Sequence, residues 1–413
     1  MCDVSSSQAV LRVPARRPGF GLPPMAAAMA TTTAAQLPVF LTSALTVQIG
    51  RDLTLGARGL AVAVAAFFGS SALCSAGLGR LADRIGGATM MRLGTIPVAG
   101  ALLWIGLGVH RWYWLVATLA IAGAANGAIQ PAANRYLTRT VDRHRQGLAF
   151  GVKQAAIPAA TLLSGLAVPA VAHTAGWRSA FVAAAVAATA AGALVRRAPS
   201  TTTVPDTNDR VINASGVAHR PAPHFARYPL LVLALGIGGA SAAANAMAAF
   251  FVLSAVSIGE NDEHAGLMVA VASVASVLVR LGIGARADRR NTGHLRLVAI
   301  MCAIGAIGPL LLAVGDPRLL VFAALVGYAI GWGWAGLFNF AVSSTHAASP
   351  GRATGLTQIG ASTGGCLGPL SFGLAAARFG YSPAWIGASL IFLTAALVIL
   401  AGRRALLTSR AHG

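Results

Sequence analysis

Twelve stretches of this 413-residue chain are long and apolar enough to cross a lipid bilayer. A helix needs about 20 mainly apolar residues to span a hydrocarbon core about 30 Å thick. Backbone N–H and C=O groups must be bonded within the protein in lipid, so stretches of this length must be helices. The stretches run approximately over residues 25–49, 59–79, 91–109, 113–134, 147–171, 179–195, 229–256, 265–283, 297–314, 319–344, 353–377 and 384–401. The sequence therefore predicts an all-α membrane protein with twelve transmembrane helices.

Charged residues are too scarce for an ordinary soluble protein. They make up 10% of the chain, against about 25% in soluble domains, and 56% of the residues are hydrophobic. This composition excludes a soluble enzyme, a disordered chain and a secreted disulfide scaffold. The four cysteines have no metal-ligand spacing, so we expect neither a metal site nor a cofactor.

The basic residues predict the orientation in the membrane. With the N-terminus in the cytoplasm, 23 arginines fall in inner segments and 6 in outer loops, which satisfies the positive-inside rule. Arg280 and the single lysine, Lys153, remain inside apolar spans. The net charge of +20 is thus a topology signal, and we expect no nucleic-acid partner.

A long polar interruption divides the chain into two halves. It holds a threonine run, prolines and mixed charges, which are typical of a linker. The predicted parts are a basic cytoplasmic tail, a six-helix bundle, a cytoplasmic linker, a second six-helix bundle and a cytoplasmic tail, over residues 1–24, 25–195, 196–228, 229–401 and 402–413.

The two halves repeat each other in sequence. Residues Gly79 to Arg84 recur as Gly284 to Arg289, 205 residues later, and Asn134 recurs as Asn339. At a spacing of 204 residues, Gly147, Gly151, Gln154 and Gly176 pair with Gly351, Gly355, Gln358 and Gly380. Parallel six-helix repeats are a transporter architecture with the substrate site between the repeats.

The segment Gly79-Arg80-Leu81-Ala82-Asp83-Arg84-Ile85-Gly86 resembles the signature loop of the major facilitator superfamily, between its second and third helices. The chain departs from that pattern at Gly87 and Ala88, where the family has two basic residues. The segment from Gly147 to Arg178 is similar to the fifth helix and following loop of bacterial members. The resemblance implies a secondary transporter in which helices 1, 4, 7 and 10 line a central cavity.

The duplicated motif is the predicted gate. A carboxylate here can accept bonds at the next helix's N-terminus or pair with arginine, and breaking that contact would bias alternating access. The alternative is a simple helix cap. The predicted gating residues are Gly79, Asp83, Arg84, Gly284, Asp288 and Arg289.

Lys153 is the most informative charge, because no carboxylate lies in the middle of any span. A lysine roughly 9 Å below the inner surface needs a partner or water. Gln154 and Gln358 are expected to form a polar layer with it. The alternative is that Lys153 snorkels to the headgroups.

Polar residues on the predicted cavity helices complete the candidate site. Asn126, Gln130 and Asn134 recur every four residues and form one stripe, while Gln36, Asn245, Trp334 and Asn339 are expected to face the same cavity. The alternative is bonding between helices, worth about 0.6 kcal/mol each. Trp332 cannot share a helix face with Trp334 and is expected to pack or face lipid.

These features favour a secondary active transporter of a small organic solute, with an anion preferred, and not an enzyme. The alternatives are a polyspecific efflux transporter of drugs or metabolites and a transport-inactive membrane sensor of the same fold. The expected partners are a small-molecule substrate, the lipid bilayer and a coupling ion of unknown identity. We expect a monomer in a bacterial plasma membrane with both termini cytoplasmic.

Overall fold

The computed structural model describes residues 22–141, 146–195, 227–289, 293–345 and 350–411, nearly all of them helical. The N-terminal helices are α1 (Leu22–Ala44), α2 (Thr46–Leu53), α3 (Ala57–Ile85), α4 (Gly87–Leu107), α5 (Trp112–Thr140), α6 (Gln146–Gln154), α7 (Ala156–Ala167), η2 (Val168–Ala172), α8 (His173–Ala175) and α9 (Trp177–Leu194). The C-terminal helices are α11 (Arg227–Ser257), α12 (Asp262–Arg289), α13 (His294–Gly305), α14 (Ile307–Val314), η3 (Pro317–Leu319), α15 (Leu320–Ala324), η4 (Leu325–Gly331), α16 (Ala335–Thr345), α17 (Pro350–Phe379) and α18 (Tyr381–Ala411).

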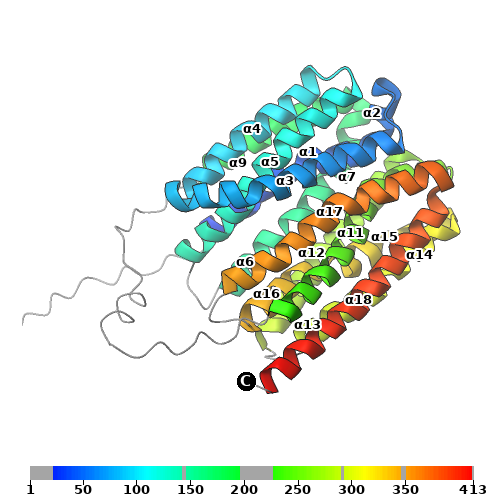
Figure 1. Cartoon of the computed structure of the whole chain (residues 1–413). Helices are drawn as coiled ribbons and strands as arrows, with labels where there is room; N and C mark the ends of the chain where they lie inside the picture. Colours follow the sequence, from blue (N-terminus) through cyan, green and yellow to red (C-terminus); the bar gives the residue numbers. More distant parts are fainter. Residues whose placement is uncertain (1–21, 142–145, 196–226, 290–292, 346–349, 412–413) are drawn as a thin grey trace, which may run out of the picture.

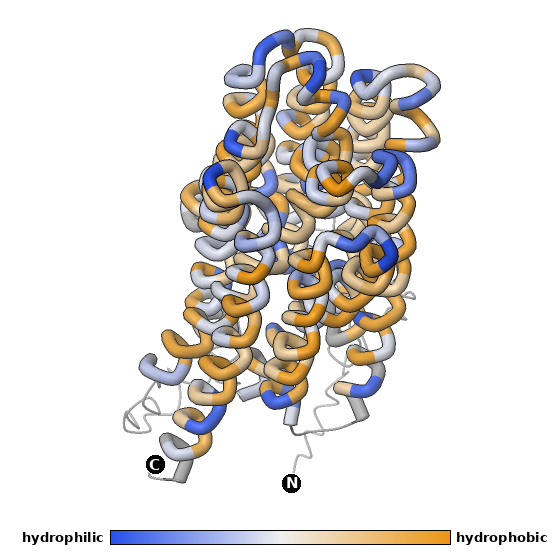
Figure 2. Tube along the Cα trace, turned by 90° about the vertical axis from the view of Figure 1, so that its right-hand side faces the viewer, coloured by the Kyte–Doolittle hydropathy of each residue, from blue (hydrophilic) through white to orange (hydrophobic). Residues whose placement is uncertain are grey.

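These elements lie side by side along one common direction, with the N-terminal and C-terminal helices in two groups (Figure 1). Each predicted span coincides with one helix or with a row of consecutive short helices. Within the described ranges, ten helical segments meet the length and hydropathy expected of a membrane span. Figure 2 shows apolar residues along the helices and polar residues gathered at the loops. The fold is therefore the all-helical membrane bundle expected from the sequence.

The passes formed by α1 and α17 fall outside those ten segments. Helix α1 carries Thr31, Thr32, Thr33 and Gln36, and all four are buried. Helix α17 is rich in glycine and also carries Gln358. Polar residues buried within a membrane protein are costly. We therefore expect the polar residues of these helices to serve a purpose other than contact with lipid.

Four passes are broken. Leu45 separates α1 from α2, and Ala306 separates α13 from α14. The fifth pass is divided into α6, α7, η2 and α8, and the tenth into η3, α15, η4 and α16. Both η2 and η4 are π-helical turns, which often occur at functional sites. Irregular backbone at membrane depth is tolerated only where protein or a water-filled space surrounds it.

Glycines set the closest helix contacts. A methyl group at Gly123 of α5 would clash with the Phe67 carbonyl oxygen of α3, and one at Gly364 of α17 would clash with the Gly238 carbonyl oxygen of α11. Small residues let transmembrane backbones approach in this way. Each group of helices is thus bound together by backbone-to-backbone packing.

The predicted repeat is visible in the backbone at Gly176 and Gly380. Their φ angles are 81° and 87°, and each stands directly before a helix, α9 and α18 respectively. Positive φ is a conformation that glycine adopts without strain. Equivalent turns thus begin the sixth and twelfth passes.

The predicted domain boundaries meet the described residues at only some points. Residues 1–21 and 196–226, most of the predicted N-terminal tail and linker, lie outside the described ranges. Helix α11 already begins at Arg227, and α18 continues to Ala411 through most of the predicted C-terminal tail.

Candidate functional site

Lys153 is buried in the last turn of α6, with 4% of its surface exposed. Its Nζ donates to the Oε1 of Gln130 on α5 at 2.5 Å. An ammonium has three donors, and the amide oxygen of Gln130 is a neutral acceptor. The snorkelling alternative does not describe this position, because the side chain points to a protein partner in the interior.

Gln130 belongs to a chain of polar contacts across α3, α5 and α6. Its Nε2 donates to Asn126 Oδ1 at 3.4 Å, and Asn126 Nδ2 donates to the Ser71 hydroxyl of α3 at 2.9 Å. Two members of the predicted stripe are therefore connected to Lys153: Gln130 bonds to it directly, and Asn126 bonds to Gln130. Asn134, one turn further along α5, is exposed.

The fifth pass breaks immediately after Lys153, for a reason that lies in its sequence. The helical partner of the Gln154 carbonyl would be the N–H of residue 158, and Pro158 has none. Helix α6 ends at Gln154, and α7 begins at Ala156. The break leaves the Gln154 carbonyl oxygen free to accept from another helix.

Arg280 of α12 uses that carbonyl. Its side chain is 5% exposed, and one guanidinium nitrogen donates to the Gln154 carbonyl oxygen at 2.6 Å. The other terminal nitrogen donates to the Trp332 carbonyl oxygen at 2.7 Å, while Nε is buried without a partner. The guanidinium also lies 6.0 Å from the Trp332 ring centre.

The other acceptor of Arg280, the Trp332 carbonyl oxygen, lies at a break in the tenth pass. Residues Trp332 to Trp334 form a turn between η4 and α16. Trp332 is 5% exposed, so it packs inside the protein and does not face lipid. The indole N–H of Trp334 is buried and has no partner. Arg280 therefore joins two interrupted passes through their backbone.

Helix α1 runs past both breaks. Thr33 donates to the Ala156 carbonyl oxygen at 3.4 Å, and the Phe40 ring lies 5.8 Å from that of Trp332. Gln36 lies between them on the same helical face, and its Oε1 is buried without a partner. Gln36 thus occupies the same layer as the Arg280 contacts.

Other predicted binding residues lie apart from Lys153. Asn245 donates to the Ser241 carbonyl at 2.8 Å, and the Ser241 hydroxyl donates to the Ala361 carbonyl at 2.7 Å, so Asn245 lies where α11 meets α17. Gln358 is exposed on α17, and Asn339 is partly buried on α16. The polar layer at Lys153 is built with Gln130, not with Gln358.

The predicted gating motifs occupy the last turns of α3 and α12 and are not free loops. The side chains of Asp83, Asp288 and Arg289 lie outside the described part of the structure, and Arg84 is exposed. A methyl group at Gly79 would lie 3.7 Å from Pro131, which is an ordinary contact, and one at Gly284 would meet nothing within 4 Å. Close packing does not require either glycine here.

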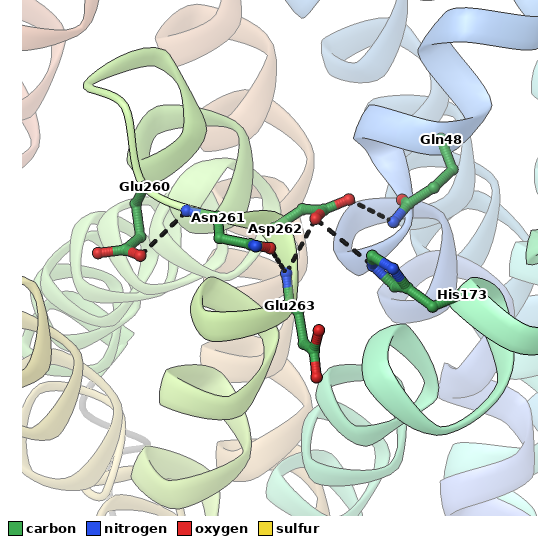
Figure 3. Close-up of polar contacts among 6 residues, drawn as sticks. All are labelled: Gln48, His173, Glu260, Asn261, Asp262 and Glu263. Carbon is green, nitrogen blue, oxygen red and sulfur yellow. Dashed lines mark hydrogen bonds and ion pairs between the residues drawn. The ribbon is translucent and has the colours of Figure 1, made fainter.

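The opposite end of the molecule carries a polar cluster that joins the two groups of helices (Figure 3). Asp262, the first residue of α12, accepts from Gln48 Nε2 of α2 at 2.7 Å and lies 3.4 Å from His173 Nε2 of α8. The backbones of Gly165 and Gly266 also touch near this end. We call it the predicted outer end, because the Arg-rich segments lie at the other.

The sequence analysis placed Arg280 inside an apolar span but did not predict it as a binding residue, and it did not single out Asp262. Arg280 is one of many arginines, but it stands nine residues inside the end of α12 in an apolar segment. That position was the available signal. The pairing of Asp262 with Gln48 across 214 residues left no local pattern.

Comparison with known proteins agrees with this architecture. The profile of the Major Facilitator Superfamily matches residues 25–369. The search of curated proteins gave no match. A crystal structure of a D-xylose-proton symporter superimposes with a TM-score of 0.72 at 15% identity, covering 93% of this chain and 97% of that one.

A bacterial homologue of the human lysosomal transporter Spinster, in an inward-facing and unoccupied conformation, gives a TM-score of 0.70 at 14% identity, covering 95% of this chain and 99% of that one. At such identities the likeness shows the fold. The family profile covers most of the chain, and the described residues are nearly all helical. The chain belongs to the major facilitator superfamily of membrane transporters.

Proposed function

We propose that this protein is a secondary active transporter that carries a small organic anion by alternating access. The observation that carries the proposal is the buried ammonium of Lys153, whose bonded partner is a neutral amide. The carboxylates with described side chains all lie at the predicted outer end, namely Asp52, Glu260, Asp262, Glu263 and Asp316.

A buried charge without a counter-ion is costly, and a bound anion would supply the missing charge. Lys153 has donors to spare, and charge-assisted bonds to a carboxylate are stronger than those to a neutral amide. The indole N–H of Trp334 adds a buried donor that lacks a partner. A cationic solute would find no carboxylate among the described interior residues.

Alternating access is supported by the unequal ends of the bundle interface. At the predicted outer end, Asp262 bonds to Gln48 and Gly165 packs against Gly266. Helices α3 and α17 meet at Gly69 and Cys366, whereas Leu73, one turn further inward, is 85% exposed. We propose that this is a state closed outside, and that Asp83 and Asp288 belong to contacts made when the inner end closes.

The arginine distribution supports cytoplasmic termini, and the family supports a multi-pass membrane location. We propose the plasma membrane of a bacterium as that location and a monomer as the working unit. We further propose that Gln36, Asn126, Gln130 and Gln154 line the path of the anion beside Lys153.

The test is a thermal-shift screen of the purified full-length protein against anionic, cationic and neutral metabolites. We expect stabilisation by a small group of organic anions, and a smaller shift in the Lys153→Gln variant. Stabilisation only by cations or neutral sugars, unchanged in that variant, would contradict the proposal. A ligand at 100 times its dissociation constant stabilises by about 2.7 kcal/mol, which such a screen resolves.

A further inference from the structure

Two buried cations from different groups of helices are connected through neighbouring residues of the fifth pass. Lys153 belongs to α6, and Arg280 of α12 bonds to the carbonyl of the residue that follows it, Gln154. Resting on the proposed function, we infer that the two form one site for a small dianion, such as a dicarboxylate, with one negative charge on each cation.

The contacts of Arg280 leave its charge uncompensated. Both of its acceptors, Gln154 and Trp332, are backbone carbonyls, which satisfy N–H groups but carry no net charge. Its Nε is buried and unpartnered, although the side chain is only 5% exposed. A purely structural arginine would be expected to use this donor as well, since unpaired buried donors are costly.

Acidic residues of the same helix are too distant to neutralise Arg280. Asp262 and Glu263 begin α12, more than four turns away, and Asp262 is engaged by Gln48. Asp288 is eight residues further on, roughly 12 Å along the helix axis. The counter-charge is therefore missing from the described surroundings of the guanidinium.

The depth of the two cations is similar. Lys153 lies seven residues from the start of α6 and Arg280 nine residues from the end of α12, so both are roughly 10–14 Å from the Arg-rich end. A single small solute at this depth can contact groups from both bundles. A monoanion would leave one cation unpaired, whereas a dianion neutralises both.

Arg280 would also couple ligand binding to the movement of the two bundles. Its bond to Gln154 crosses from one group of helices to the other and must change when the bundles move. The neighbouring Ser276, four residues earlier on the same face of α12, has a buried hydroxyl without a partner. These groups place donors on the C-terminal side of the site, opposite Lys153 on the N-terminal side.

The experiment compares ligands of different charge on the purified full-length protein. Affinities for butyrate, succinate, glutarate, tricarballylate and sulfate would be measured by calorimetry in wild type, Lys153→Gln and Arg280→Gln. We expect a dianion to bind roughly thirtyfold or more tightly than butyrate, as for a buried charge pair. Sulfate separates an inorganic from an organic dianion, and either preference supports the inference.

In each single variant the preference for a dianion over butyrate should fall to near unity. Arg280→Lys keeps the charge and should retain much of the preference, even if it lowers stability. Arg296→Gln, an exposed arginine of α13, is the matched control and should behave as wild type.

Two results would overturn the inference. If butyrate binds wild type as tightly as succinate while Lys153→Gln still loses it, anion transport stands but the second charge site falls. If Arg280→Gln and Arg280→Lys both unfold more easily with an unchanged ligand preference, Arg280 only joins α12 to the two broken passes. Binding of no anion at all would instead remove the proposed function.

Discussion

The two sides of the polar layer use different chemistry. On the N-terminal side, Lys153 is held by side chains, through Gln130 and Asn126 to Ser71. On the C-terminal side, Arg280 is held by the backbone, at carbonyl oxygens released by two breaks. The duplicated sequence therefore did not produce a duplicated site.

The difference teaches how each side can respond to a ligand. A side-chain acceptor such as Gln130 can rotate away when an anion takes its place, whereas a carbonyl is fixed by its helix. We therefore expect the N-terminal side to set affinity and the C-terminal side to couple binding to helix movement. The predictions below change, in turn, the acceptor of Lys153, the gating motifs at the inner end and the Gln154 carbonyl that Arg280 uses.

The largest effect is expected at Gln130. Gln130→Glu would place a carboxylate where Lys153 now meets an amide, so it should lower anion affinity roughly thirtyfold while the protein remains folded. Gln130→Leu would instead remove the acceptor and cost roughly 1.5–3 kcal/mol of stability, part of which a bound anion restores. Calorimetry and thermal denaturation of the two variants check this. Equal anion affinity in wild type and Gln130→Glu would mean that Lys153 does not meet the substrate.

The next effect concerns the two copies of the gating motif. Asp83 stands four residues before α4 begins, in the more complete copy, whereas Asp288 belongs to the weaker one. Asp83→Asn should slow transport at least tenfold, about 1.4 kcal/mol in the barrier, with substrate binding and membrane insertion largely intact. Asp288→Asn should slow it less. Lower protein yield with normal specific activity would favour a simple helix cap.

The smallest effect is expected at Pro158. Pro158→Ala would add a backbone N–H at residue 158 that can donate to the Gln154 carbonyl oxygen. This N–H would then compete with Arg280 for that oxygen. Bonds of this kind are worth about 0.6 kcal/mol in membranes, so the KM for substrate should change about threefold. Pro97→Ala makes the same chemical change within α4, away from Arg280, and serves as the control. Identical kinetics in the two variants would argue against a role for the released carbonyl.

The fold could be predicted from the sequence because it depends on local sequence patterns. Apolar length and arginine distribution predict helices and their direction. Each predicted span coincides with helical segments, and within the described ranges ten segments meet the length and hydropathy of a membrane span. Breaks within passes are harder to see. The one at Ala155 could have been read from Pro158, since a proline removes the partner of the carbonyl four residues earlier. The turn at Trp332 to Trp334 has no proline to signal it in the sequence.

Only part of the candidate site could be predicted from the sequence. Lys153 stood out because it is the single lysine, and Gln130 because it recurs with Asn126 at helical spacing. Arg280 was also found inside an apolar span, but it was not predicted as a binding residue, because its acceptors are backbone atoms that leave no sequence pattern. Gln358 was expected beside Lys153 from the repeat, but packing placed Gln130 there. Residue identity can suggest a side-chain partner but not a released carbonyl.

The most direct test of anion transport is the KM of Lys153 variants in proteoliposomes, using an anion found by the screen. Lys153→Gln should raise the KM at least tenfold, about 1.4 kcal/mol, whereas Lys153→Arg keeps the charge and should stay within about threefold of wild type. If the transported solutes are cations or neutral sugars, and Lys153→Gln carries them as well as wild type, the central claim is wrong.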